Sequence, residues 1–268
     1  MSAFQKIRQM EKIGLIPAAG IANRLGPLAF SKELFPIGFN AKKKEGGLKA
    51  VSTYLLEKYR LAGVKKVYTV VRKGKWDILD YYGDGGEIGI KMAYLIMGHP
   101  FGVPYTLDQA YPFVKTAKIF LGFPDILFEP ENAFTVADAA FDQERADLML
   151  GLYPINDKKQ MQQSDMVQFD KHGHITEIIV KPKKTDLKFS WVFAIWKPEF
   201  TLFMHNHLKY ELGERQKHST QVEIHLGHVI QSAIESGFTV FGHLFSDFHY
   251  IDMGNPENIS QAIREYFV

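Results

Sequence analysis

Strand and helix signals alternate through the first half of this chain, and that alternation constrains the fold more than any other feature. Apolar runs typical of buried strands occur at 12–19, 65–71, 88–96, 117–123 and 146–153. Apolar residues at helical spacing lie between them, at 48–61, 76–82, 106–114 and 132–142, with Thr106 as an expected N-cap. This β-α-β-α rhythm predicts an α/β fold with a mostly parallel, doubly wound sheet.

The second half follows a different pattern. Residues 164–182 alternate apolar and polar side chains on both sides of a Lys-His-Gly turn, which predicts a β-hairpin. An aromatic strand at 189–196, helices at 199–212 and 221–236, and a closing helix at 256–266 follow, with strands expected at 238–245 and 248–251. No interdomain linker interrupts the sequence, so we expect one domain over 11–268 after an N-terminal tail over 1–10.

The composition argues against several classes of function. The 268 residues include 32 Lys and Arg against 30 Asp and Glu, a net charge of +2, which lacks the basic surplus of a nucleic-acid-binding domain. The absence of cysteine excludes disulfide scaffolds and cysteine nucleophiles and favours a cytoplasmic location. No apolar run reaches the ~18–20 residues of a membrane-spanning helix. We therefore expect no nucleic-acid partner and no membrane partner.

A loop rich in small and basic residues follows the first predicted strand, over 18–38. Gly20 and Gly26 allow the backbone to approach a ligand closely and to turn N–H groups toward phosphate oxygens. Arg24 and Lys32 would neutralise the phosphate charge. The loop matches neither the Rossmann G-x-G-x-x-G pattern nor Walker A. It is either a phosphate site of another kind or an ordinary loop with two solvated cations.

Two aspartates lie near the ends of predicted strands. Asp125 follows the strand at 117–123, and Asp252 comes directly after the strand at 248–251. Open α/β sheets bind ligands outside the carboxyl ends of their strands. Because Mg²⁺ takes one or two carboxylates together with phosphate oxygens and water, the pair is a candidate Mg²⁺ site. The alternative is that Asp125 caps a turn and Asp252 caps the last helix.

Five motifs follow one another in an order typical of a known enzyme family. They are the loop at 18–38, PFGVPYTLDQA at 100–110, FLGFPDILF at 120–128, MVQFDKHGHITEIIVKP at 166–182 and YIDMGNPENISQA at 250–262. Together they resemble the sugar-phosphate nucleotidyltransferases, especially the glucose-1-phosphate thymidylyltransferase type. The resemblance implies a nucleotide-diphospho-sugar transferase-like fold, with a Rossmann-like, mixed, mostly parallel sheet flanked by helices.

The resemblance also implies an activity and its residues. An NTP, with dTTP favoured, would react with a sugar 1-phosphate, with glucose 1-phosphate favoured, to give an NDP-sugar and pyrophosphate in the presence of Mg²⁺. The expected catalytic residues are Arg24, Lys32 and Asp125, and the expected metal ligands are Asp125 and Asp252. The expected nucleotide-binding residues are Ala19, Gly20, Asn23, His99 and Gly102. The expected sugar-phosphate-binding residues are Lys181 and Trp191.

Several positions depart from the family pattern. Val180 stands where the family has a glutamate that contacts sugar hydroxyls, and Ser190 stands where an asparagine is expected. Ala22 replaces a loop glycine, and His99 precedes the second loop where a base-reading glutamine is common. The expected phosphate- and metal-binding residues therefore match the family better than the residues expected to contact the sugar and the base. We expect the specificity for the acceptor to differ from that of the thymidylyltransferases.

Two other functions remain open at this point. One is a cytidylyl- or uridylyltransferase that uses another acceptor. The other is a catalytically weak homologue that binds a nucleotide sugar for regulation, which the changes at Ala22 and Val180 would suit. The sequence also leaves open whether the chain forms a homo-oligomer.

Overall fold

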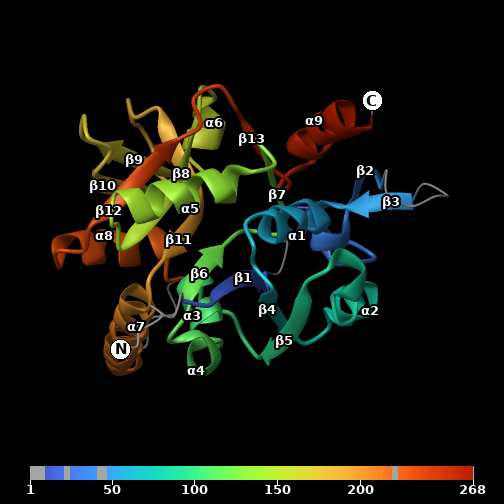
Figure 1. Cartoon of the computed structure of the whole chain (residues 1–268), viewed down its shortest axis with the longest axis horizontal. Helices are drawn as coiled ribbons and strands as arrows, with labels where there is room; N and C mark the ends of the chain where they lie inside the picture. Colours follow the sequence, from blue (N-terminus) through green and yellow to red (C-terminus); the bar gives the residue numbers. More distant parts are fainter. Residues whose placement is uncertain (1–9, 21–24, 41–46, 219–222, 268) are drawn as a thin grey trace, which may run out of the picture.

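The computed structural model describes residues 10–20, 25–40, 47–218 and 223–267. Most of the predicted tail, residues 1–9, lies outside them. The centre is a nine-stranded sheet (Figure 1). Its strands are β1 (Lys12–Ala18), β4 (Lys66–Arg72), β5 (Lys91–Met97), β6 (Lys118–Leu121), β8 (Leu148–Pro154), β9 (Asp165–Phe169), β10 (Ile175–Val180), β11 (Phe189–Trp196) and β12 (Val240–Leu244).

The sheet is mixed, with the order β10-β9-β11-β6-β1-β4-β5, and β8 pairs with both β11 and β12. Strand β1 runs parallel to β4 and β6, whereas β11 runs antiparallel to β6, β8 and β9. The apolar sequence of β1 suits its central position, which is covered on both faces. The register pairs Ala18 with Val71 and Leu15 with Leu121. The carboxyl ends of β1, β4 and β6 therefore lie along one edge.

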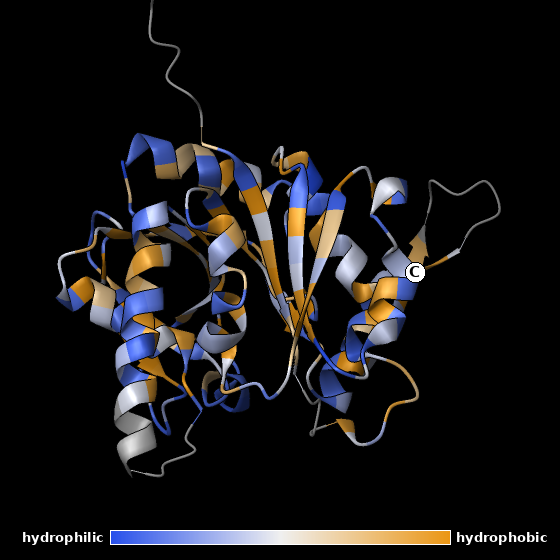
Figure 2. Cartoon of the chain, turned by 90° about the horizontal axis from the view of Figure 1, so that it is seen from below, coloured by the Kyte–Doolittle hydropathy of each residue, from blue (hydrophilic) through white to orange (hydrophobic). Residues whose placement is uncertain are grey.

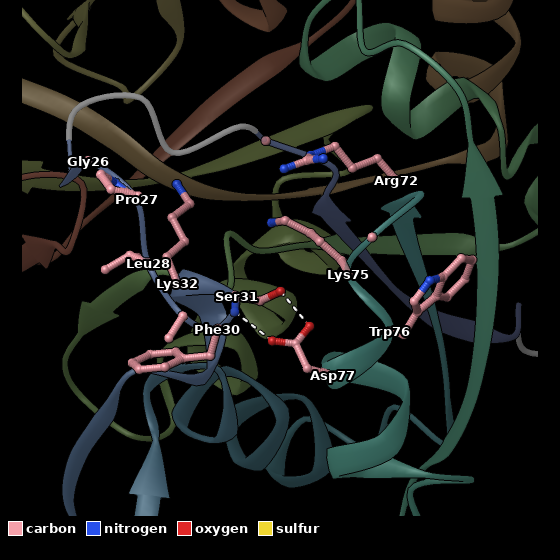
Figure 3. Close-up of a pocket in the computed structure, with 13 residues that line it drawn as sticks. Gly26, Pro27, Leu28, Phe30, Ser31, Lys32, Arg72, Lys75, Trp76 and Asp77 are labelled. Carbon is pink, nitrogen blue, oxygen red and sulfur yellow. Dashed lines mark hydrogen bonds between the residues drawn. The ribbon is translucent and has the colours of Figure 1, made fainter.

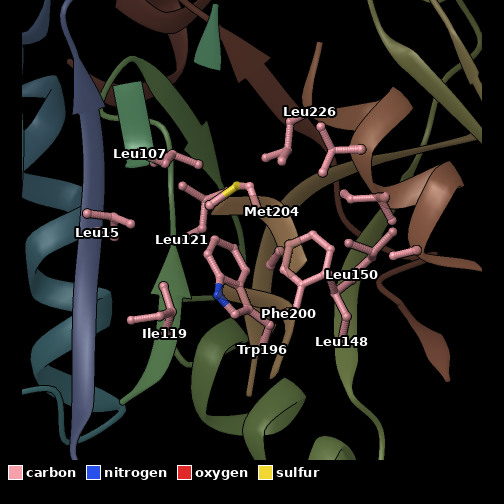
Figure 4. Close-up of a cluster of buried hydrophobic side chains, with 14 of the residues drawn as sticks. Leu15, Leu107, Ile119, Leu121, Leu148, Leu150, Trp196, Phe200, Met204 and Leu226 are labelled. Carbon is pink, nitrogen blue, oxygen red and sulfur yellow. The ribbon is translucent and has the colours of Figure 1, made fainter. Parts of the chain in front are cut away.

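Helices cover both faces of the sheet (Figure 1). One face packs against α3 (Val103–Asp108), α4 (Tyr111–Val114), α7 (Pro198–His218) and α8 (Leu226–Glu235), and Figure 4 shows part of this core. The other face packs against α1 (Val51–Leu61), α2 (Trp76–Tyr82) and α5 (Ala133–Gln143). The covering helices mix hydrophilic and hydrophobic residues (Figure 2). Among the helices of the described residues, none is both long and apolar enough to cross a membrane.

A small third core joins the beginning and the end of the fold. It lies between two two-stranded sheets, β2 (Pro36–Asn40) with β3 (Gly47–Ala50) and β7 (Ile126–Phe128) with β13 (Tyr250–Asp252), and the helix α9 (Pro256–Tyr266). Its buried members are Ile37, Val51, Leu127, Ile251, Met253 and Ala262. The remaining short helices of the described residues are η2 (Lys32–Leu34), η3 (Gly86–Ile88) and α6 (Lys158–Met161).

The expected α/β fold is confirmed, and so is the hairpin, which is formed by β9 and β10. The expected helix at 106–114 is wrong in its start and its continuity, because α3 begins at Val103 and α4 is a separate turn. Thr106 is no N-cap; its hydroxyl donates to the Gly102 carbonyl at 3.0 Å, one turn earlier in α3. Pro112 lacks the N–H that would continue the helix, which accounts for the break.

Candidate active site

A cavity of about 430 Å³ lies beside the ends of β1 and β4 (Figure 3). The loop after β1 and the turn after β4 form its wall. The lining residues are Gly20, Gly26, Pro27, Leu28, Ala29, Phe30, Ser31, Lys32, Arg72, Gly74, Lys75, Trp76 and Asp77. We call this space the first cavity. Its position at the carboxyl ends of two parallel strands is where an α/β sheet binds ligands.

The first cavity is lined by cations. In Figure 3 the nitrogen ends of Lys32, Arg72 and Lys75 point toward the same space. Nε of Arg72 is buried and has no hydrogen-bond partner among the described residues. The guanidinium carries further N–H groups, which can donate to an anion that enters the cavity. The arrangement therefore suits phosphate oxygens.

Two contacts hold the wall of the first cavity in place. Ser31 donates to the Asp77 carboxylate from its backbone N–H at 2.6 Å and from its hydroxyl at 2.7 Å (Figure 3). Lys75 Nζ lies 2.6 Å from Glu33 Oε1, and both side chains are buried. Burial raises the pKa of Glu33 despite the opposing effect of Lys75. Burial also lowers the pKa of Lys75, although Glu33 opposes that change.

A second cavity, of about 210 Å³, holds most of the remaining candidate residues. Its wall comes from the segment after β6, the hairpin β9–β10, β11, β13 and the start of α8. The lining residues are Val103, Phe123, Asp125, Ile126, Gln163, Ser164, Asp165, Lys181, Ser190, Trp191, Glu223, His225, Leu226, Tyr250 and Asp252. The structure thus brings Asp125, Asp252, Lys181 and Trp191 together in one place.

The antiparallel pair β7–β13 places the two aspartates beside each other. Asp252 is in register with Ile126, and the Met253 N–H donates to the Asp125 carbonyl at 2.9 Å. Asp252 Oδ1 accepts from the Gly254 N–H at 2.8 Å. Asn255, not Asp252, caps α9, because its side chain accepts from the Asn258 N–H. The helix-cap alternative for Asp252 is therefore wrong.

An ion pair joins the two cavities. Lys32 lines the first cavity and Asp125 the second, and Lys32 Nζ lies 2.5 Å from Asp125 Oδ2. Burial alone would raise the pKa of Asp125, but the Lys32 ammonium outweighs it and the pKa is lowered. Asp125 in turn raises the pKa of Lys32 well above its usual range. The pair therefore remains charged at neutral pH.

The aspartate pair has the chemistry of a partial Mg²⁺ site. Within the described part of the chain, no group of three or more His, Cys, Asp or Glu residues could enclose a metal ion. Mg²⁺ does not need such a cage, because it keeps several waters and binds one or two carboxylates with substrate phosphates. Asp125 and Asp252 fit that requirement when phosphate oxygens complete the ligand set.

The two predicted sugar-phosphate residues differ in their environments. Lys181 is exposed at the end of β10 and has a φ of 44°, a left-handed conformation that is uncommon for a residue other than glycine. Trp191 is 8% exposed and contributes to the core as well as to the second cavity. Trp191 can therefore pack in the core and still face a ligand in the second cavity.

The predicted nucleotide-binding residues are only partly brought together. Gly20 lines the first cavity, and Ala19 is buried directly before it. His99 is exposed, and neither His99 nor Gly102 lines either cavity. A Cβ on Gly102 would lie 2.1 Å from the Ile224 carbonyl oxygen, so this glycine serves close backbone packing. Asn23 and Arg24 lie outside the described residues.

Three further residues line the two cavities but are not singled out by the sequence interpretation. Arg72 and Lys75 follow β4, and the basic sequence RKGK directly after an apolar strand was the available signal. Asp165 begins β9 opposite Val180, a position that the predicted hairpin implied but did not single out. Each can be recognised as a cavity-lining residue only when it is known which strand ends lie next to each other in the sheet.

Comparisons with known proteins all identify nucleotidyltransferases. A family model described as nucleotidyl transferase matches residues 13–267. The chain is 23% identical over 252 residues to the low-salt glycan biosynthesis nucleotidyltransferase Agl11 of Haloferax volcanii, covering 93% of this chain and 64% of that relative. It is 22% identical over 252 residues to a glucose-1-phosphate thymidylyltransferase of Neisseria gonorrhoeae, covering 93% of this chain and 80% of that protein.

A solved structure supports the fold. The chain superposes with a TM-score of 0.77 on a Bacillus anthracis protein described as a glucose-1-phosphate thymidylyltransferase, in complex with sucrose. The match covers 95% of both chains at 16% identity. The mixed, mostly parallel sheet flanked by helices is thus the architecture of that protein as well.

Proposed function

Since the chain belongs to the nucleotidyl transferase family, we propose that it joins an NTP to a sugar 1-phosphate, forming an NDP-sugar and pyrophosphate. We favour dTTP and glucose 1-phosphate because the relative from Neisseria gonorrhoeae is a glucose-1-phosphate thymidylyltransferase. A cytidylyl- or uridylyltransferase acting on another acceptor is the alternative within the same reaction class.

One observation carries this proposal: the Lys32–Asp125 ion pair connects a cation-lined cavity to a carboxylate-lined cavity. A transfer between two phosphorylated substrates needs two adjoining binding spaces of this kind. One side must hold the triphosphate and the departing pyrophosphate, and the other must hold the acceptor. The reacting phosphorus would lie where the two spaces meet.

The reaction proceeds by in-line attack. An oxygen of the sugar phosphate attacks the α-phosphorus of the NTP, the bond from that phosphorus to the bridging oxygen breaks, and pyrophosphate leaves. Negative charge grows on the α-phosphate oxygens, so catalysis depends on positioning and on charge stabilisation. Lys32, Arg72 and Lys75 would hold the triphosphate, and Lys181 would hold the acceptor phosphate. By family resemblance, Arg24 would add a further cation.

Asp125 and Asp252 would hold Mg²⁺, which when bound supplies positive charge beside the reacting phosphate oxygens. The protein residues have the remaining tasks. Lys32 lies against Asp125 and would orient the triphosphate from the same place. The buried Lys75–Glu33 pair would keep the cationic wall rigid.

The proposal is tested by measuring pyrophosphate release. Purified protein with Mg²⁺ is combined with each of five nucleoside triphosphates and with a panel of sugar 1-phosphates. We expect release that requires the NTP, the acceptor and the metal together, with dTTP and glucose 1-phosphate the fastest pair. A different fastest pair would correct the substrates. Binding of nucleotide sugars without release by any pair would support the regulatory homologue instead.

The metal assignment predicts a specific defect for Asp252→Asn. Removal of one charged ligand should raise the Mg²⁺ concentration for half-maximal activity by at least about tenfold, since even partners outside the ligand sphere typically cost ~10–100-fold. The measurement is a Mg²⁺ titration of pyrophosphate release at saturating substrates. Asp247→Asn is the matched control, because Asp247 is exposed five residues away. Equal Mg²⁺ requirements for both variants would contradict the assignment.

A further inference from the structure

The second cavity contains a carboxylate that the sequence interpretation does not single out, that of Asp165. By the family resemblance, a glutamate that contacts sugar hydroxyls is expected at position 180, at the end of β10, and this chain has Val180 there. In the β9–β10 hairpin, Asp165 is the direct cross-strand partner of Val180. Both side chains lie close to Gly227 of α8: its Cβ position would be 2.6 Å from Asp165 Oδ2 and 2.8 Å from Val180 Cγ2.

We propose that the Asp165 carboxylate recognises the acceptor in this protein. It would bind a sugar hydroxyl in place of the glutamate that is absent at position 180. The proposal rests on the proposed function and adds a specificity residue to it. The carboxylate has moved from one strand of the hairpin to the facing position of the other. It therefore still reaches the cavity that Asp125, Asp252 and Lys181 line.

The surroundings of Asp165 suit a ligand that donates a hydrogen bond. Burial raises the pKa of Asp165, although Lys181 and His228 oppose the rise. The Gly227 N–H also lowers the pKa as a donor. An ionised carboxylate only accepts hydrogen bonds and has room for about four, so Asp165 can accept from a further donor. A sugar hydroxyl can donate to it. Lys181, which stabilises the Asp165 anion from the same cavity, would meanwhile hold the acceptor phosphate.

Trp191 supplies the complementary group. Its Nε1 is buried and has no hydrogen-bond partner of ordinary geometry among the residues that the structure describes, although it lies near enough to Asp165 to lower its pKa. An indole N–H only donates. A hydroxyl that approaches both residues from the second cavity could accept from Trp191 and donate to Asp165. The pair therefore selects a group that both donates and accepts, as a hydroxyl does.

The test combines one protein variant with modified acceptors. Asp165→Asn keeps the shape of the side chain and removes its charge. Wild type, Asp165→Asn and the control Glu177→Gln are assayed with Mg²⁺ and the preferred NTP, using glucose 1-phosphate and its 2-, 3-, 4- and 6-deoxy analogues. Glu177 is exposed on β10, three residues before Val180.

We expect Asp165→Asn to raise KM for glucose 1-phosphate by about 10–100-fold, the loss of one charge-assisted hydrogen bond. KM for the NTP should stay unchanged, and Glu177→Gln should behave as wild type. One deoxy analogue should react poorly with wild type but suffer little further penalty with Asp165→Asn. If Asp165 had only a structural role, removal of any one acceptor hydroxyl should reduce activity as much in Asp165→Asn as in wild type.

The possible failures are distinguishable. If wild type releases pyrophosphate and Asp165→Asn has an unchanged acceptor KM, the role of Asp165 is overturned and the proposed function stands. The same conclusion follows if every deoxy penalty persists undiminished in Asp165→Asn. If wild type releases no pyrophosphate with any NTP and sugar 1-phosphate, both proposals are overturned.

Discussion

Replacing Lys32 by alanine should lower kcat for pyrophosphate release by about 10²–10³-fold, the usual cost of losing one preorganised donor at a developing charge. Lys32 is the only lysine or arginine among the described residues lining the first cavity that also pairs with Asp125. Its loss would remove a cation from the triphosphate and the counter-charge from the half-buried Asp125 carboxylate. Because the interaction strengthens in the transition state, kcat and kcat/KM should fall together.

Lys66→Ala is the control for this variant. Lys66 also forms an ion pair, with Glu11 at 2.9 Å, but on the exposed surface at the start of β4. Exposed pairs contribute about 0–1 kcal/mol, so Lys66→Ala should retain full activity. Circular dichroism would establish that Lys32→Ala is folded. Full turnover and an unchanged KM in a folded Lys32→Ala protein would show that the loop is only a connector.

Replacing Lys75 by methionine should reduce the free energy of unfolding by about 3–5 kcal/mol, the typical cost of removing one partner of a buried ion pair. Lys75 and Glu33 are only 5% and 2% exposed, and they lie 2.6 Å apart. The substitution would leave the Glu33 carboxylate buried without its counter-charge. Urea denaturation of wild type and variant measures the difference.

Two controls identify the cause of that destabilisation. Lys73→Met changes an exposed neighbour and should shift stability by no more than about 0.5 kcal/mol. The double variant Glu33→Gln/Lys75→Met should recover much of the loss, because no buried charge remains. If Lys75→Met alone were as stable as wild type, the pair would contribute nothing to folding.

The same variant has a defined pH dependence. The pKa of Glu33 is raised in the folded state by burial, and removal of Lys75 would raise it further. A carboxyl group whose folded pKa exceeds its unfolded pKa stabilises the protein when protonated and loses that contribution as pH rises. Part of the stability lost in Lys75→Met should therefore return as pH falls from 8 toward 5. A constant difference from wild type over that range would contradict this explanation.

The long elements of the fold could be predicted because each has a strong local pattern. The apolar sequence of β1 and the alternation in β9 and β10 specify strands without reference to the rest of the chain. The strands β2 and β3 flank a Gly- and Lys-rich segment whose composition is typical of a loop. Strand β7 has only three residues, too few for a clear pattern. These short strands depend on the third core, which forms from residues far apart in sequence.

The candidate site could be predicted where a residue follows a recognisable strand. Asp125 and Asp252 are predicted in this way, and both line the second cavity. Arg72, Lys75 and Asp165 needed the order of the strands, since their importance comes from neighbours across the sheet rather than along the chain. His99 was expected near the base from its motif alone, and it lies outside both cavities.

The antiparallel pair β7–β13 also determines when the site can first form during synthesis, because β13 must have been translated. It joins Asp125 to Asp252, and the stretch between them takes roughly 6–25 s to translate at about 5–20 residues per second. During that interval a nascent chain already contains Lys32 and Asp125 but has no β13 to complete the wall beside them. Ligands that bind at the completed wall could therefore assist only the last stage of folding, and a ribosome-bound chain that stops before residue 250 should be inactive.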